Sequence, residues 1–512
     1  MKHKNKNSDD TFTKISFPDW MRPILAVGNG EEPGEKSAHI EMKLYPGEDD
    51  DNINKYIDWV FNSLNNIVSS ISKYPKKGSE EEKPEPQNEK VNQLVRWAHV
   101  FYEQDKYEAC VEIVNEILNN RQTNGVSREL LEEILLMKTA ILSDSLPISP
   151  KQKVANLEEA IRSYEVVTEN DTLSNKEKSL KLNLLSLKYR YQPDIPHKTR
   201  LLRNLVAECD SVLELNEKGE NDTEDDKLEI LLTKAWVLSD LIEQERNKAV
   251  MRLDICSILG ITLKLLHHQA RNSHYWALCS YSLPFLTQIS SPDYWVGLLE
   301  RSCSILESIV DEIDEPNRAI LGNMAWMYTK LAKNTTRPHL AAYSLGRARD
   351  LLSRKKYILE EDLKKQDLRK EAYHYLLSNT YVNMARVETV DASLSVACEQ
   401  KISHLHSAIS LCETAINLNP YNAGARARHT KAIVMLSDYH YSKQAMGDML
   451  TSAIQKCMDA LSFAIDPAHL YHAMSLAYGK LAIISDSKDA ERYKEEADRY
   501  NQLANECNVL NK

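Results

Sequence analysis

Apolar residues recur with helical spacing along most of this 512-residue chain. From residue 91 to residue 508, segments with a period near 3.6 residues follow one another with short connections. Two of these segments, 360–388 and 391–418, are long. Only 14 glycines and 17 prolines are present, and the turn clusters that a sheet-rich protein needs about every 8–12 residues are missing after residue 95. The pattern predicts an all-α protein.

The N-terminal region differs from the rest of the chain. Residues 1–10 are polar and predict a disordered tail. In the arm that follows, at 11–74, Phe17, Trp20 and Met21 form a local apolar cluster. An exposed tryptophan in a flexible segment is unfavourable. We therefore expect these three side chains to anchor the arm, either on the helical array of the same chain or as a short motif that a partner recognises.

Two elements are predicted in the remainder of the arm. Apolar residues at alternate positions over 40–44 predict a short strand-like segment. Asp50 or Asp51 can cap a helix whose apolar stripe must dock on another element. That stripe consists of Ile53, Ile57, Val60, Phe61, Leu64, Ile67, Val68 and Ile71. The chain is thus divided into a tail (1–10), the N-terminal arm (11–74), a charged flexible linker (75–90), a first half of the helical array (91–213), an acidic loop (214–226) and a second half (227–512).

One stretch of the array resembles a known repeat. Residues 406–420, with Ala408, Ala415 and Pro420, resemble the second helix of a tetratricopeptide repeat. In that family two small residues admit the neighbouring helices and a proline ends the helix. Weaker matches are Tyr107 with Ala109, Ala160 with Tyr164, Leu321-Gly322, Ala341 with Ala348, and Ala453 with Ala460 and Leu461. The resemblance implies a right-handed α-α superhelix, a tetratricopeptide-like solenoid with an irregular N-terminal arm.

The repeat is degenerate, because the spacing of these matches is irregular against about 34 residues in the family. The alternative is that alanine at seven-residue spacing is a packing stripe of an ordinary helical bundle. No subfamily follows from these residues.

The resemblance also implies a binding face. In the family, the first helix of each hairpin lines a concave groove. Counting from the matches above puts Asn323, Trp326 and Lys431 on that face, with Arg428 beside Lys431. The alternative is that Trp326 fills the core and that the two basic residues are ordinary surface charges. Ala319 stands where chaperone-binding members have a lysine, so capture of a C-terminal carboxylate is not expected.

Charge and hydropathy restrict the partners. The net charge is −11 and no run of about five or more basic residues occurs, so nucleic acid is not expected as a direct partner. No stretch of about 18 apolar residues is present, so no membrane span is expected. The 9 cysteines include no Cys-x-x-Cys pair, and Cys110, Cys412 and Cys457 lie on apolar stripes. We expect buried, reduced thiols and a cytoplasmic or nuclear location.

Catalytic motifs are absent from the sequence. Phosphate-binding loops, the dinucleotide fingerprint, zinc-protease, serine-hydrolase and kinase signatures are all missing. The histidine pairs and the acidic run at 49–51 lack the spacing of metal ligands, and packing or helix-end roles explain them better. No catalytic, cofactor-binding or metal-binding residue is predicted, and no cofactor is expected.

The leading hypothesis is a non-catalytic scaffold or adaptor that binds one or more proteins or extended peptide segments on the concave face of its array. One alternative is an all-α helical-repeat enzyme subunit of the prenyltransferase kind. Another is a helical subunit of a trafficking or translation-related complex. The sequence leaves the oligomeric state open.

Overall fold

The computed structural model describes most of the helical array. It covers residues 50–70, 107–119, 150–168, 175–190, 195–216, 224–242 and 247–510, except 314–317, 366–369, 440–441 and 465–466, together with isolated positions between 94 and 138 and at 245. The strand-like segment at 40–44, the linker at 75–90 and the arm residues Phe17, Trp20 and Met21 lie outside the described residues.

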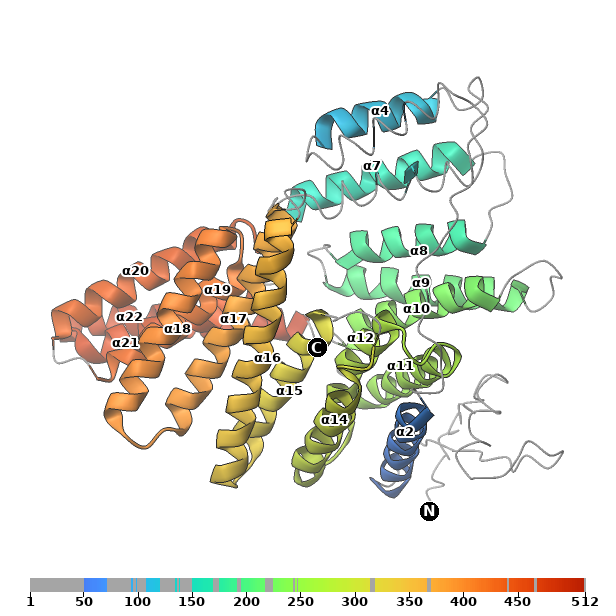
Figure 1. Ribbon diagram of the computed structural model, residues 1–512. Coiled ribbons are helices and arrows are strands. Elements are labelled where there is room, and N and C mark those ends of the chain that lie inside the picture. The colour runs from blue at the N-terminus through green and yellow to red at the C-terminus, as the bar shows by residue number, and fades with distance from the viewer. Residues whose placement is uncertain are drawn as a thin grey trace, which may run out of the picture.

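Every regular element in the described part is a helix (Figure 1). The helices are α2 (Asp50–Ser70), α4 (Tyr107–Asn119), α7 (Pro150–Thr168), α8 (Asn175–Arg190), α9 (Ile195–Asn216), α10 (Glu224–Ile242), α11 (Lys248–His268), α12 (Ser273–Ser282), α13 (Leu286–Ile289), α14 (Trp295–Ile309), α15 (Arg318–Asn334), α16 (Pro338–Lys365), α17 (Lys370–Leu394), α18 (Cys398–Leu418), α19 (Ala423–Ser437), α20 (Lys443–Leu461), α21 (Ala468–Ile484) and α22 (Ser487–Leu510). None of them is long and apolar enough to cross a membrane.

Successive helices pair into hairpins that stack along the chain. In the C-terminal half the pairs are α15 with α16, α17 with α18, α19 with α20 and α21 with α22. The first helices of these pairs also contact one another, α15 with α17, α17 with α19 and α19 with α21. They therefore form an inner layer, and the second helices form an outer layer. This confirms the predicted tetratricopeptide-like solenoid.

The repeat signature at 406–420 has the packing role that the resemblance implied. Ala408 and Ala415 of α18 are fully buried. Ala408 belongs to a cluster with Ala385 of α17 and Ala432 of α19. Because none of these side chains extends beyond Cβ, the three helices approach closely. The helix ends at Leu418, immediately before the Asn419-Pro420 pair.

Some predicted boundaries were wrong. The segment predicted at 360–388 is divided between α16, which continues to Lys365, and α17. The apolar stripe of α16 continues to the end of the helix, because Leu359 is fully buried against Tyr373 and Leu377 of α17. The segment predicted at 391–418 is interrupted between α17 and α18, where Val396 is 96% exposed and has no core to join.

Both ends of the predicted acidic loop at 214–226 lie in helices, and residues 217–223 lie outside the described residues. Helix α9 continues to Asn216 and α10 begins at Glu224.

The array contains two large apolar cores. One extends from α2 to α16 and reaches Val387 of α17, and the other joins α19 to α22. Small clusters around α17 and α18 connect them. Cys110, Cys412 and Cys457 are buried without disulfides, as their positions on apolar stripes predicted.

Helix α2 of the N-terminal arm docks on the array, between α11 and α14 (Figure 1). The Tyr56 hydroxyl donates a hydrogen bond of 2.9 Å to the carbonyl oxygen of Cys256, 200 residues away in the chain. Phe61 is fully buried, and the Arg301 guanidinium lies 4.2 Å from the centre of its ring. Arg301 also forms an ion pair of 2.7 Å with Asp58. The predicted apolar stripe therefore completes the core of a distant part of the chain.

Truncation of Phe61, the buried aromatic residue of α2, should destabilise the array. We expect Phe61→Ala to lower the free energy of unfolding by about 3–5 kcal/mol, because the ring is lost from a fully buried site. The matched control is Asn62→Ala, which truncates the neighbouring exposed side chain and should change the value by less than about 0.5 kcal/mol. Urea unfolding followed by circular dichroism measures both. Equal, small effects would show that α2 is not part of the core.

Helix α19 buries a histidine that should make stability depend on pH. His429 is 2% exposed, and its Nδ1 has no hydrogen-bond partner among the described residues. Burial, and then the positive charge of Lys456, lower the pKa of His429 to about 4. The Glu413 carboxylate at 3.5 Å opposes this only in part.

Between pH 6.5 and about 4 the unfolded chain binds a proton at His429 that the folded chain does not bind. The free energy of unfolding should therefore fall over this window, by up to about 3 kcal/mol at its acidic end. His429→Gln should remove this part of the pH dependence, whereas His274→Gln, at an exposed position, should retain it. Urea unfolding at a series of pH values tests this. A His429→Gln protein with the wild-type slope would contradict it.

Candidate functional site

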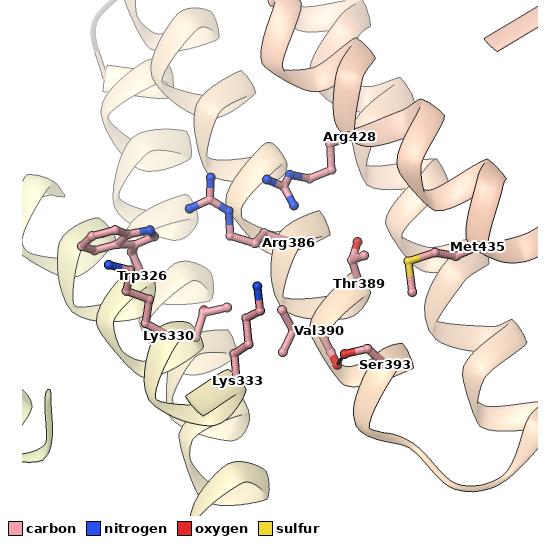
Figure 2. A pocket seen from close by; sticks show the side chains of 10 residues that line it. Trp326, Lys330, Lys333, Arg386, Thr389, Val390, Ser393, Arg428 and Met435 are labelled. Carbon is pink, nitrogen blue, oxygen red and sulfur yellow. Dashed lines mark hydrogen bonds between the residues drawn. The ribbon is translucent and has the colours of Figure 1, made fainter. Parts of the chain in front are cut away.

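A cavity of about 510 Å³ opens on the inner layer, where α15, α17 and α19 meet. It lies between the helices of the two large cores, and Figure 2 shows the side chains that line it. We call it the inner groove and define it by its lining residues, which are Trp326, Thr329, Lys330, Lys333, Arg386, Thr389, Val390, Ser393, Arg428 and Met435.

Helical spacing brings these residues onto one surface. On α15, Trp326, Lys330 and Lys333 are separated by four and three positions, which places them on one side of the helix. The α17 residues, from Arg386 to Ser393, and the α19 residues, Arg428 and Met435, follow the same rule. Each helix buries its opposite side in the array. The side that lines the groove is therefore the one accessible to solvent and to a ligand.

The inner groove concentrates positive charge. Lys330, Lys333, Arg386 and Arg428 line it, and Lys431 lies one turn further along α19. Within the described residues none of these five side chains forms an ion pair with a carboxylate, although the chain has 75 acidic residues against 64 basic ones. The chain as a whole thus has an excess of carboxylates, but none of those in the described part pairs with a cation of the groove.

The charges in the groove affect each other's ionisation. Burial lowers the pKa of Arg386, and burial together with the charge of Arg386 lowers the pKa of Arg428 to about 10. The pKa of Lys330 is lowered by burial, then by Arg386 and Lys333. That of Lys431 is lowered by burial, then by Arg428 and Arg386. Arg386 thus lies at the centre of the positive field.

Several arginines outside the inner groove, among them three on α16, are paired with carboxylates. On α16 the Arg347 guanidinium lies 2.8 Å from Glu307, and that of Arg354 lies 2.7 Å from Asp311. Arg349 on the same helix contacts both Glu388 and Asp391. Each of these α16 arginines thus has a carboxylate partner, whereas none of the five cations in or beside the groove has one within the described residues.

Apolar and hydroxyl groups complete the surface. The Lys330 ammonium lies 4.4 Å from the centre of the half-buried Trp326 ring, a cation–π contact. Val390 and Met435 provide apolar surface on α17 and α19, beside the hydroxyl of Thr389 (Figure 2). The groove can accept an anionic ligand that also has apolar parts.

The structure brings together part of the sequence-predicted set. Trp326 and Arg428 both line the inner groove, and Lys431 adjoins it. Asn323 does not line it, because its side-chain amide donates a hydrogen bond of 2.9 Å to the Ser280 hydroxyl between α15 and α12.

Sequence reasoning missed three cations, Lys330, Lys333 and Arg386. The first two stand four and seven positions after Trp326, so extending that face by helical spacing would have found them. Arg386 falls in the segment whose boundaries were predicted wrongly. No repeat match lies on α17, so the position of Arg386 on an inner helix could not be found by counting from a repeat.

The described residues hold no cluster of side chains with the composition of a metal site. No group of three or more His, Cys, Asp or Glu side chains in this part of the chain could hold a metal ion. His404 of α18 lies 2.6 Å from the Glu388 carboxylate of α17, so it contacts a neighbouring helix. The inner groove supplies cations and apolar surface, which suit binding.

Comparisons with known proteins give only weak structural likenesses. No known protein family and no curated protein matches the chain. Among solved structures, the human IFIT1 dimer with m7Gppp-AAAA is 11% identical, with a TM-score of 0.37, over 88% of this chain and 99% of that one. A circular tandem repeat protein with novel repeat topology is 12% identical, with a TM-score of 0.25, over 88% of this chain and 99% of that one.

The tetratricopeptide domain of P58(IPK) is 11% identical, with a TM-score of 0.19, over 81% of this chain and 99% of that one. These values are too low to transfer a ligand or an activity from any of the three.

Removal of the most desolvated groove cation should stabilise the free protein. Arg428 is ionised at neutral pH although the folded state lowers its pKa, and its Nε has no partner among the described residues. We expect Arg428→Met, which retains the aliphatic stem, to raise the free energy of unfolding by about 1–3 kcal/mol. Urea unfolding at low salt measures the change.

The matched control lies two residues earlier on α19. Arg426 donates hydrogen bonds to the carbonyl oxygens of Pro420, at 3.0 Å, and Lys456, at 3.4 Å. Arg426→Met should therefore destabilise the protein. An equal loss of stability in both variants would mean that Arg428 is a structural residue.

Proposed function

We propose that this protein is a non-catalytic scaffold or adaptor whose inner groove binds an extended acidic segment of a partner protein. The observation that supports the proposal is the cluster of unpaired, partly desolvated cations on the inner layer. Retaining such a cluster lowers the stability of the free protein, and a ligand that neutralises it recovers that energy.

The dimensions of the inner groove suit a peptide. It crosses three neighbouring inner helices, and packed helices lie about 8–10 Å apart. The groove therefore spans about 20 Å, the length of about six residues of extended chain at about 3.3 Å each. Val390 and Met435 give such a chain apolar contacts beside its charged contacts with Arg386 and Arg428.

The same surface is less suited to a nucleic acid strand. Single strands are usually held by aromatic side chains on which successive bases stack. Trp326 is the one aromatic residue among the groove-lining side chains, and its ring already contacts Lys330. The free cysteines are in keeping with a reducing compartment, the cytoplasm or the nucleus.

Binding should be lost on charge reversal in the groove. The probe is a pool of fluorescein-labelled nonapeptides with Glu at alternate positions and Leu, Val, Ser or Gly between them. We expect the full chain to bind this pool, and not a pool with Lys in place of Glu. Arg386→Glu should weaken binding at least tenfold, because attraction becomes repulsion at the centre of the positive field. Fluorescence anisotropy measures the affinity.

The matched control is Lys443→Glu, at an exposed lysine on the outer helix α20, which should keep the affinity within twofold of the wild type. Equal affinity of the wild type for acidic and basic pools, or equal affinity of both variants for the acidic pool, would overturn the proposed function.

A further inference from the structure

Two guanidinium groups lie next to each other in the inner groove. Arg386 of α17 and Arg428 of α19 come from neighbouring helices, and Figure 2 shows their side chains next to each other on the same side of the cavity. Each guanidinium has five N–H donors in a planar fork. Within the described residues neither forms an ion pair, and the buried Nε of Arg428 has no acceptor.

One carboxylate cannot satisfy this arrangement. A carboxylate supplies one negative charge and two oxygens, whereas two guanidinium groups present two charges and two forks. Lys330 and Lys431 add further positive charge close by, since the charge of Arg386 contributes to the lowered pKa of each. A ligand that matches this point has a charge near −2 and at least three acceptor oxygens.

A phosphomonoester has both properties. At neutral pH it has about −1.5 to −2 charges and three strong acceptor oxygens. Arginine forks bind phosphate oxygens in pairs, and clusters of arginine are the usual means by which proteins recognise phosphorylated segments.

The neighbouring surface indicates what flanks the phosphate. Val390 stands one turn after Arg386 on α17, and Met435 stands two turns after Arg428 on α19. One turn of helix rises about 5.4 Å and two turns about 10.8 Å, which about two and about three residues of an extended chain span. An apolar side chain two or three residues from the phosphorylated one reaches this surface.

We propose that the acidic segment bound in the inner groove includes a phosphorylated serine or threonine, whose phosphate lies between Arg386 and Arg428 while an apolar neighbour packs on Val390 and Met435. This inference rests on the proposed function and narrows it, from an acidic segment to a phosphorylated one. The protein would then bind its partner more tightly once a kinase has acted on that partner.

The test uses the acidic peptide pool with its central residue fixed as Ser, as phosphoserine or as Glu. We expect the phosphoserine pool to bind the full chain at least tenfold more tightly than the Ser pool and at least fivefold more tightly than the Glu pool. Fluorescence anisotropy at constant ionic strength measures all three.

Arg386→Lys separates charge from the guanidinium fork. Lysine keeps the positive charge but cannot bind two phosphate oxygens in the same plane. The variant should lose affinity for both the Ser and phosphoserine pools, with a loss at least fivefold larger for phosphoserine. Lys443→Glu again serves as the control that changes neither.

The outcomes distinguish the two proposals. Equal binding of the Ser and phosphoserine pools would overturn the phosphate inference and leave the acidic-segment function standing. If neither pool binds but a 5′-phosphorylated RNA oligonucleotide does, and Arg386→Glu abolishes that binding, both are overturned in favour of nucleic acid. If inorganic phosphate raises the melting temperature as much as the phosphoserine pool does, the subsite takes a free anion and the phosphorylated segment is ruled out.

Discussion

The contact between Ala385, Ala408 and Ala432 sets the distance between the inner helices α17 and α19. All three side chains are fully buried, and each ends at Cβ, so α18 seats closely against both helices. Arg386 follows Ala385 directly, and Arg428 lies one turn before Ala432. The spacing of two charged groups on the groove side is thus fixed by apolar packing on the other side.

Placing the groove between two cores explains how the fold tolerates its charge. The core from α2 to α16 and the core from α19 to α22 each bury long apolar stripes, and only small clusters join them. Unpaired cations at this junction cost part of the stability that the flanking cores supply. Elsewhere on the surface, as at Arg347 with Glu307, the same residue type is matched by a carboxylate. The charge distribution therefore separates a stabilised outer surface from an inner surface available to a ligand.

The N-terminal arm contributes to this framework from far away in sequence. Through Tyr56 and Phe61, α2 fills a place between α11 and α14 that the neighbouring hairpins leave open. A solenoid normally depends on contacts between adjacent repeats. Here a long-range contact supports the core from α2 to α16. That core extends to the inner helix α15, which holds Trp326 and Lys330.

The sequence by itself determined the helices, the direction of their buried faces and the repeat type, because helical periodicity and small-residue spacing are local properties of the chain. It also identified Trp326 and Arg428, which line the inner groove. It could not place Arg386 beside Arg428, since they are far apart in sequence and only the seating of α18 brings them together. Nor could it show that Asn323 is bound to Ser280. Which charges remain unpaired depends on every neighbour in three dimensions, and only the tertiary structure decided that.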